Sequence, residues 1–169
     1  MGGQPPAIDA EEAFVGTRPP EGEDVLDLGR LSDWMAANVA GFEGPLEQEK
    51  FKGGQSNPTY RLTARSGSYV LRRKPFGKLL PSAHAVDREY TVQSGLHSVG
   101  FPVARQYGLC TDDSVIGSWF YIMDMVDGRA IWNGEMPDAQ PGERTAVYNE
   151  MCDVLAQLHS VDLERAGLT

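Results

Sequence analysis

The stretch from Phe51 to Leu62 limits the possible folds more than any other part of the chain, because it sets two adjacent glycines between strand-like runs. It reads Phe51-Lys52-Gly53-Gly54-Gln55-Ser56-Asn57-Pro58-Thr59-Tyr60-Arg61-Leu62. The glycines let the backbone turn tightly and approach anionic oxygens, to which exposed N–H groups and the Ser56 hydroxyl can donate. Ordinary hairpins also contain such turns, and there Asn57 before Pro58 would serve only to shape the turn. The flanking residues must decide between the two interpretations.

A basic strand and then a helix follow the turn. Residues 59–64 and 69–73 alternate across a second glycine-containing turn, which predicts an antiparallel hairpin, and residues 46–51 are predicted to pair beside it. Apolar residues at helical spacing predict a helix that opens at Ser82 and ends at Gly100.

Three cations lie at the end of the second strand of the hairpin, and a carboxylate of the helix can reach one of them. Arg72 and Lys74 share one face of the strand, whereas Arg73 takes the other. Asp87 and Glu89 lie about 200° apart around the helix, so we expect only one of them to face the strand. A strand cation held by a helix carboxylate is typical of a phosphate site. The alternatives are a solvated strand edge and an exposed helix acid.

The other segments complete a predicted α+β order of three strands, a helix and two strands, followed by a long helix. These remaining elements are a flexible leader (residues 1–26), a helix capped by Asp27 and ended by Gly41, strands over residues 102–109 and 118–126 with a turn at Asp112-Asp113 between them, and an amphipathic helix over residues 143–159.

Composition and charge exclude several classes of function. The chain has 169 residues, 41% of them hydrophobic, which is enough for a core, and a net charge of -9. Nine of its 15 basic residues but only two of its 24 acidic residues lie within residues 51–106. A localised phosphate ligand fits this block better than nucleic acid, because the acidic remainder repels a polyanion and no aromatic residues are interleaved.

Cysteine usage and hydropathy predict a cytoplasmic protein. Cys110 and Cys152 are far apart, and the chain starts without a secretory signal pattern, so we expect free thiols in a reducing compartment. No apolar run approaches the roughly 18 residues of a membrane span, so we expect no membrane partner. The motifs H-E-x-x-H and G-x-S-x-G are absent, which argues against metal and serine hydrolases.

Six segments of the sequence can be compared with known families. They are G-G-Q-S-N-P-T-Y, Y-V-L-R-R-K-P, L-L-P-S-A-H-A-V-D-R-E-Y, G-F-P-V, S-V-I-G-S-W-F-Y-I-M and L-A-Q-L-H-S. Together they resemble the aminoglycoside phosphotransferase (APH) family, and within it the branch fused to, or encoded near, acyl-CoA dehydrogenases. The resemblance runs from about Leu28 to the end of the chain. It implies a protein-kinase-like small lobe over residues 27–126, built from a five-stranded antiparallel sheet plus a helix. Residues 127–169 would form the hinge and the first helix of an incomplete large lobe.

The resemblance also implies cofactors and site residues. ATP with magnesium would donate its γ-phosphate to a small-molecule hydroxyl, which in this branch belongs to a hydroxyacyl-CoA. The residues implied to cover the phosphates are Gly53, Gly54, Gln55, Ser56 and Asn57. Arg72 takes the place of the usual lysine, with Lys74 as the alternative, and Glu89 is its partner. For adenine, the resemblance implies Met123 at the back of the pocket, the Asp124 carbonyl as acceptor and the Val126 N–H as donor.

The catalytic part of the family pattern does not occur in these residues. The family's H-G-D-x-x-x-x-N loop and a later metal-binding aspartate are both missing from the sequence, so we predict no catalytic residue and no magnesium ligand here. We expect the nucleotide-binding half of a phosphotransferase, truncated before its catalytic loop. The alternatives are a non-catalytic nucleotide- or partner-binding module completed by another chain, and a remnant without function. The apolar face of residues 143–159 predicts self-association.

Overall fold

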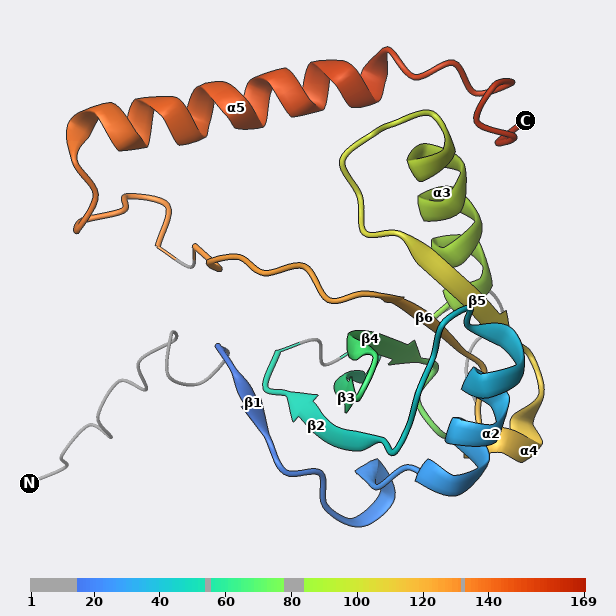
Figure 1. Cartoon of the computed structure of the whole chain (residues 1–169). Helices are drawn as coiled ribbons and strands as arrows, with labels where there is room; N and C mark the ends of the chain where they lie inside the picture. The colour runs from blue at the N-terminus through green and yellow to red at the C-terminus, as the bar shows by residue number, and fades with distance from the viewer. Residues whose placement is uncertain (1–14, 54–55, 78–83, 132) are drawn as a thin grey trace, which may run out of the picture.

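The structure, a computed structural model, describes residues 15–53, 56–77, 84–131 and 133–169 (Figure 1). Its strands are β1 (Thr17–Arg18), β2 (Glu47–Phe51), β3 (Thr59–Ala64), β4 (Gly67–Arg73), β5 (Gln106–Cys110) and β6 (Phe120–Asp124). Its helices are the 3-10 turn η1 (Gly22–Asp24) and the α-helices α2 (Leu28–Asn38), α3 (Val86–Ser98), α4 (Asp113–Ile116) and α5 (Pro141–His159). The α+β class and the order of the five predicted strands around α3 are confirmed.

The strands form one antiparallel sheet in the order β1-β2-β3-β4-β6-β5. Central β4 carries Arg72, which lies opposite Thr59 on one side and Tyr121 on the other. The sheet has six described strands, which corrects the five that we predicted. The additional strand, β1, comes from the predicted leader and pairs with the end of β2, Thr17 opposite Phe51. Two residues are too few to show a period of two, so the sequence pattern does not reveal this strand.

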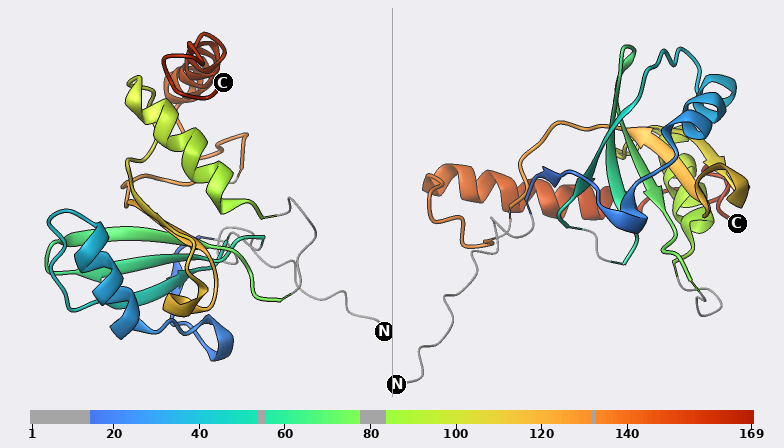
Figure 2. Two further views of the ribbon diagram at one scale, coloured as in Figure 1. Left: turned by 90° about the vertical axis from the view of Figure 1, so that its right-hand side faces the viewer. Right: turned by 90° about the horizontal axis from the view of Figure 1, so that it is seen from below.

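Different helices cover the two faces of the sheet (Figure 2). Leu31 and Met35 of α2 are fully buried in a core that includes Leu71 of β4 and Ile122 of β6. Helix α4 adds Ile116 to the same core. Helix α3 packs on β5 and β6. Side chains alternate along a strand, so the residues on either side of Leu71 and Ile122 point away from α2, toward the face that α3 covers.

Local sequence signals explain where several helices begin. Asp27 caps α2 as predicted, and its side chain accepts a hydrogen bond from a backbone N–H of the first turn. The predicted turn at Asp112-Asp113 is a one-turn helix, α4, which Asp112 caps in the same way. Ser82, the predicted start of α3, lies outside the described residues, and the helix begins at Val86.

One buried arginine ties the sheet to the segment that precedes α2. Arg73 is 2% exposed; its guanidinium lies 3.8 Å from the centre of the Phe76 ring and donates to the Tyr60 hydroxyl. Its counter-ion is Asp24 of η1, 3.8 Å away, which also pairs with Lys50 at 2.7 Å. Burial acts to raise the pKa of Asp24, but the hydrogen bond and charge of Lys50, together with two arginine charges, hold that pKa below its usual value.

A close contact fixes the residues after α5 against α3. Gly95 lies in α3, and a Cβ atom built there would lie 2.5 Å from the carbonyl oxygen of Ala166 and 2.9 Å from the Leu168 side chain. Ala166 itself is buried. Figure 1 shows this C-terminal turn beside the end of α3. Glycine is therefore the residue that leaves room for the turn.

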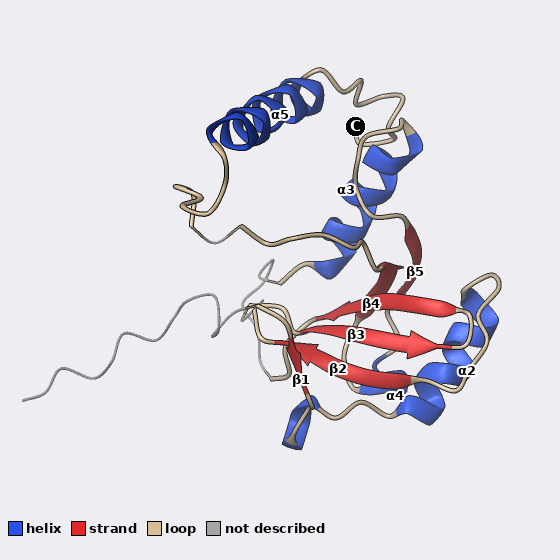
Figure 3. Cartoon of the chain, turned by 60° about the vertical axis from the view of Figure 1, so that its left-hand side comes forward, coloured by secondary structure: helices blue, strands red, loops and turns tan. Residues whose placement is uncertain are grey.

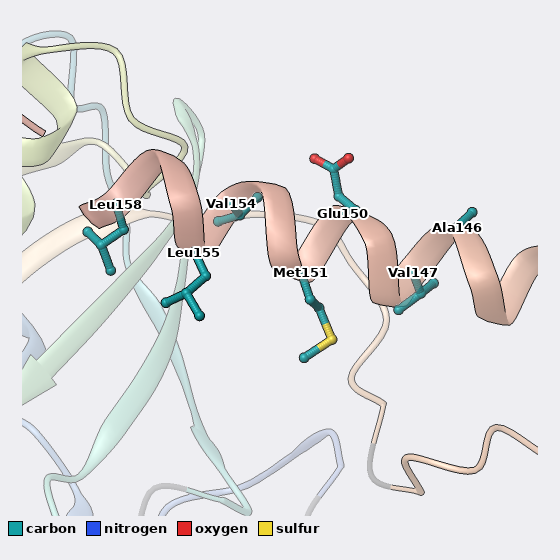
Figure 4. A pocket seen from close by; sticks show the side chains of 7 residues that line it. All are labelled: Ala146, Val147, Glu150, Met151, Val154, Leu155 and Leu158. Atoms are coloured by element: carbon teal, nitrogen blue, oxygen red, sulfur yellow. The ribbon is translucent and has the colours of Figure 1, made fainter. Parts of the chain in front are cut away.

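Helix α5 stands apart from the sheet (Figure 3), and none of its residues is buried. Its apolar side chains Val147, Met151, Leu155 and Leu158 project from one side (Figure 4). Met151 is 61% exposed and Leu155 is 52% exposed. This is the apolar face predicted for residues 143–159. Among the described residues, no helix is both long enough and apolar enough to cross a membrane.

The substitution Asp24→Asn should lower the free energy of unfolding by about 3 kcal/mol at neutral pH, because Arg73 would remain buried without an anion. The folded-state pKa of Asp24 is lowered, so its contribution is present above the unfolded pKa and is lost as the pH falls through the folded pKa. Wild type and variant should therefore converge in acid, well below the ordinary pKa of 3.8. Urea denaturation followed by circular dichroism at neutral pH and at about pH 2 measures both effects.

The matched control for this experiment is Asp27→Asn. Asp27 also pairs with an arginine, Arg30, but both side chains are more than half exposed. Asn caps a helix about as well as Asp does, so the change should stay below about 1 kcal/mol. Equal losses in the two variants, or a loss for Asp24→Asn that persists in acid, would contradict the role of Asp24.

The substitution Gly95→Ala should release residues 162–169 from α3. Alanine is favoured over glycine inside a helix by about 1 kcal/mol, so α3 itself should gain stability while the C-terminal turn is displaced. We expect amide hydrogen exchange in residues 162–169 to become about tenfold faster. Gly142→Ala in α5 is the control, because a Cβ there meets nothing within 4 Å. Unchanged exchange in Gly95→Ala would show that the contact is not a constraint.

Candidate functional site

An ion pair joins strand β4 to helix α3. Arg72 Nε donates to Glu89 Oε2 at 2.8 Å, and Nη2 of the same guanidinium donates to Oε1 at 3.5 Å. The two side chains are 27% and 32% exposed, so the pair lies at the boundary between solvent and the protein interior. The structure therefore brings together Arg72 and Glu89, the strand cation and helix carboxylate that the family resemblance paired.

Lys74, the alternative cation, is engaged elsewhere. Its ammonium group lies 3.7 Å from Asp87 and 3.9 Å from the centre of the Trp119 ring. This corrects the expectation that only one of the two helix acids faces the strand. Lys74 lies one position beyond the end of β4, and from there its long side chain reaches the first turn of α3. Asp87 and Glu89 thus hold different cations.

Asn57 ties the end of the glycine-rich turn to the same carboxylate. Its side chain is buried, its Nδ2 donates to Glu89 Oε1 at 3.0 Å, and its Oδ1 lies 2.7 Å from His84 Nδ1. Because an amide oxygen can only accept, His84 carries a proton on Nδ1. The backbone carbonyl of Asn57 also accepts from Arg72 Nη1 at 3.4 Å. Asn57 therefore links the end of the turn to the ion pair.

A hydroxyl group on β6 completes the contacts of Glu89. Tyr121 donates to Glu89 Oε2 at 3.0 Å and accepts from Gln93 Nε2 at 3.3 Å. Burial, followed by the negative charge of Glu89, raises the pKa of Tyr121 to about 12. The phenol therefore stays protonated at neutral pH. Arg72, Asn57 and Tyr121 together fix the position of the carboxylate.

The glycine-rich turn lies between β2 and β3, next to this network. Gly53 follows β2 and is half-buried, whereas Ser56 near the start of β3 is exposed. Gly54 and Gln55, which were also predicted to cover phosphates, lie outside the described residues. Where the turn is described, its far end is held by Asn57 and the Ser56 side chain is accessible to a ligand.

An open pocket of about 590 Å³ lies beside the end of β6. All three residues predicted to contact adenine, Met123, Asp124 and Val126, line it. The sheet contributes Phe51, Thr59 and Val70, and the segment before β1 contributes Val15 and Gly16. Most of this lining is apolar or backbone, as expected for a pocket that takes a flat heterocycle.

The carboxylate of Asp124 is used within the protein. The Tyr107 hydroxyl donates to it, and this hydrogen bond, together with burial, raises the pKa of Tyr107 to about 12. The side chain of Asp124 is therefore held by β5. The adenine prediction concerns only backbone groups of this segment, the Asp124 carbonyl at the end of β6 and the Val126 N–H after it.

The pocket and the ion pair share one face of the sheet. Val70 lines the pocket, and Arg72 lies two residues along the same strand, about 7 Å away. Thr59 joins the two sites, because it lines the pocket and its Oγ1 accepts from Arg72 Nη1 at 3.1 Å. A ligand with a flat apolar end and an anionic end would meet the pocket with the first and Arg72 with the second.

The described residues of the site offer a cation for an anionic ligand and no cluster of side chains that could hold a metal ion. Within the described ranges, no three His, Cys, Asp or Glu side chains cluster so as to hold a metal. Glu89, the carboxylate beside Arg72, already accepts hydrogen bonds from three side chains.

Arg72, Glu89 and Asn57 were predicted as site residues from the sequence, whereas Tyr121 and His84, which also hold this network, were not. Tyr121 could have been found, because its alternation with Phe120 and Ile122 puts it on the face of Arg72. His84 has no such signal. It precedes the helix in a left-handed conformation, with φ of 57°, and only the folded chain brings it to Asn57.

Comparison with known proteins places these features in a family. The family model of the APH phosphotransferase enzyme family matches residues 47–169. The chain is 46% identical over 147 residues to acyl-CoA dehydrogenase family member 11 of Gallus gallus and 42% identical over 147 residues to the Homo sapiens protein of the same name. Both alignments cover 85% of this chain but 19% of the relative, so the chain spans about a fifth of these curated relatives.

A solved structure shows the same fold. It is the crystal structure of a protein from Ralstonia eutropha JMP134 assigned as an aminoglycoside phosphotransferase, with 45% sequence identity and a TM-score of 0.74. The similarity covers 85% of this chain and 41% of that protein. The predicted kinase-like small lobe is thereby confirmed, and the chain belongs to the APH phosphotransferase enzyme family.

Proposed function

We propose that these residues bind ATP as the phosphate donor of a phosphotransferase that acts on the hydroxyl group of a small molecule. The base would occupy the pocket beside Met123 and Val126. The triphosphate would extend along β4 to Arg72 and to the turn between Gly53 and Asn57. Family membership supports phosphate transfer, and the geometry of the site supports the nucleotide.

The observation that carries the proposal is the position of Arg72. It lies at the junction of an apolar pocket and a glycine-rich turn, and Glu89 holds it at 2.8 Å. A solvated strand edge would not need a carboxylate that is itself fixed by Asn57 and Tyr121. A strand cation paired with a helix carboxylate is the arrangement by which kinase-like enzymes hold nucleotide phosphates.

Each described group has a separate task in this proposal. ATP supplies the phosphoryl group when bound. Arg72 would offset the charge of the inner phosphates. Its planar fork already donates four hydrogen bonds to Glu89, Asn57 and Thr59, so its positive charge and one remaining N–H would face a phosphate oxygen. Glu89 and Asn57 keep the fork aimed at the ligand. The Ser56 hydroxyl and the backbone of the turn would donate to phosphate oxygens.

Magnesium enters the proposal as the ion that accompanies ATP. The described residues fit the nucleotide but not a metal cage, so we assign no magnesium ligand among them. The sequence also lacks the H-G-D-x-x-x-x-N motif that the family uses to orient the acceptor. We therefore assign nucleotide binding to these residues and no role in removing a proton from the acceptor.

The acceptor that we propose is a hydroxyacyl-CoA. This part rests on the names of the relatives, which are acyl-CoA dehydrogenase family members, and on the resemblance to the branch associated with those enzymes. The described part of the site would bind ATP, the phosphate donor. Assays of phosphate transfer to hydroxyacyl-CoA and to aminoglycosides, made with a protein that also contains the catalytic loop, would separate the two acceptor classes.

The substitution Arg72→Met should weaken the binding of ATP at least about tenfold, because charge-assisted hydrogen bonds contribute about 1.5–3 kcal/mol. Binding of adenosine should not change, since adenosine has no phosphate to meet Arg72. Dissociation constants for the two ligands, measured by NMR titration of the folded chain, give the comparison. NMR suits this measurement because we expect weak binding.

Lys74→Met is the matched control for charge, since it removes one positive charge two residues further along the chain. We expect it to leave ATP binding within about twofold of wild type, because Lys74 is engaged by Asp87 and Trp119. If Lys74→Met weakened ATP binding as much as Arg72→Met, the loss would not be specific to Arg72, and the assignment of Arg72 as the phosphate contact would be wrong. A folded wild-type chain that bound neither ATP nor adenosine would refute nucleotide binding altogether.

A further inference from the structure

We propose that residues 15–18 form a fixed wall of the nucleotide pocket and contact the base or ribose through Val15 and Gly16. We call these four residues the N-terminal strap. The inference rests on the proposed nucleotide site, but it concerns residues that precede the part of the chain matched by the family model, residues 47–169.

The strap is bonded to the sheet at the edge of the pocket. Its β1 residues pair with the end of β2, Thr17 opposite Phe51, and the Thr17 hydroxyl donates to Glu49 Oε1 at 2.9 Å. One step further on, the N–H of Lys52 donates to the Gly16 carbonyl at 3.1 Å. The strap therefore continues the sheet up to the start of the glycine-rich turn.

The residues that follow the strap anchor it a second time. Asp24 pairs with Lys50 of β2 and with the buried Arg73 of β4. The buried Leu26 donates its N–H to the side chain of Gln48 at 3.1 Å. Because the strap is bonded to β2 and the residues that follow it are bonded to the sheet as well, the strap is held as part of the sheet, and the pocket has this wall before any ligand arrives.

The position of the strap selects the part of the ligand that it meets. Val15 and Gly16 line the same pocket as Val126 and Gly128, which follow β6. Arg72, the proposed phosphate contact, does not line this pocket. The isopropyl side chain of Val15 can pack against the face of a base or the edge of a ribose. It has no charge and no hydrogen-bond donor with which to bind a phosphate. The strap should thus contribute equally to the binding of adenosine and of ATP.

Glycine at position 16 is required by backbone conformation. Its φ is +86°, in the left-handed region that side chains rarely adopt, although a Cβ there would meet nothing within 4 Å. This conformation lets the Gly16 carbonyl accept from Lys52 while Val15 lines the pocket.

The test is an NMR titration of the whole chain with adenosine and with ATP, comparing Val15→Ala with Val25→Ala. Val25 is the matched control: it follows η1 in the same segment, is 55% exposed and does not line the pocket. Val15→Ala should weaken the binding of both ligands by the same factor, about three- to tenfold, for the loss of two methyl groups that a ligand would partly cover. Val25→Ala should behave as wild type. In wild type, adenosine should shift the amide signals of Val15 and Gly16.

The outcomes separate this inference from the proposed function. If wild type binds adenosine but Val15→Ala binds it equally well, or if the amide signals of the strap do not move, the strap is not part of the site while nucleotide binding stands. If Val15→Ala weakens ATP but not adenosine, the strap acts on the phosphates and the assignment is wrong. If the folded wild type binds neither ligand, both proposals fail together.

Discussion

The alternation of side chains along β4 is the constraint on which the rest of the structure depends. Leu71 and Arg73 point into the core beneath α2, whereas Val70 and Arg72 point to the face of the pocket and α3. A shift of one residue in the pairing of this strand would exchange the two sets. The core and the proposed phosphate site are therefore specified by the same register, set by pairing with β3 and β6 on either side.

Arg72 and Arg73 are neighbours in the sequence, but their different burial gives them different roles. Arg73 is enclosed by Phe76 and Tyr60 and is neutralised at a distance by Asp24. Arg72 is partly exposed, and its partner Glu89 leaves the edge of the guanidinium within reach of a ligand. The first joins parts of the fold that are distant in sequence, and the second is available for binding.

Features with a period could be predicted from the sequence, and features that arise from the meeting of distant segments could not. The alternation of strand residues and the turn of a helix narrowed the choice to Arg72 or Lys74 and to Asp87 or Glu89, and the family resemblance then paired Arg72 with Glu89. The strand β1 is too short to have a period, and the bond between His84 and Asn57 joins two loops. Asp87 was misjudged for a related reason, because helical angles describe directions around an axis and say nothing of how far a lysine side chain extends.

Helix α2 has a consequence for what counts as the folding unit. The family model begins at residue 47, yet Leu31 and Met35 of α2 have no exposed surface and cover Leu71 and Ile122. The family model therefore covers fewer residues than the hydrophobic core requires, because the core also includes residues of α2. Residues 28–38 cover the apolar face of the sheet. A protein that began at residue 47 would expose this face to solvent, and large exposed apolar surfaces tend to associate.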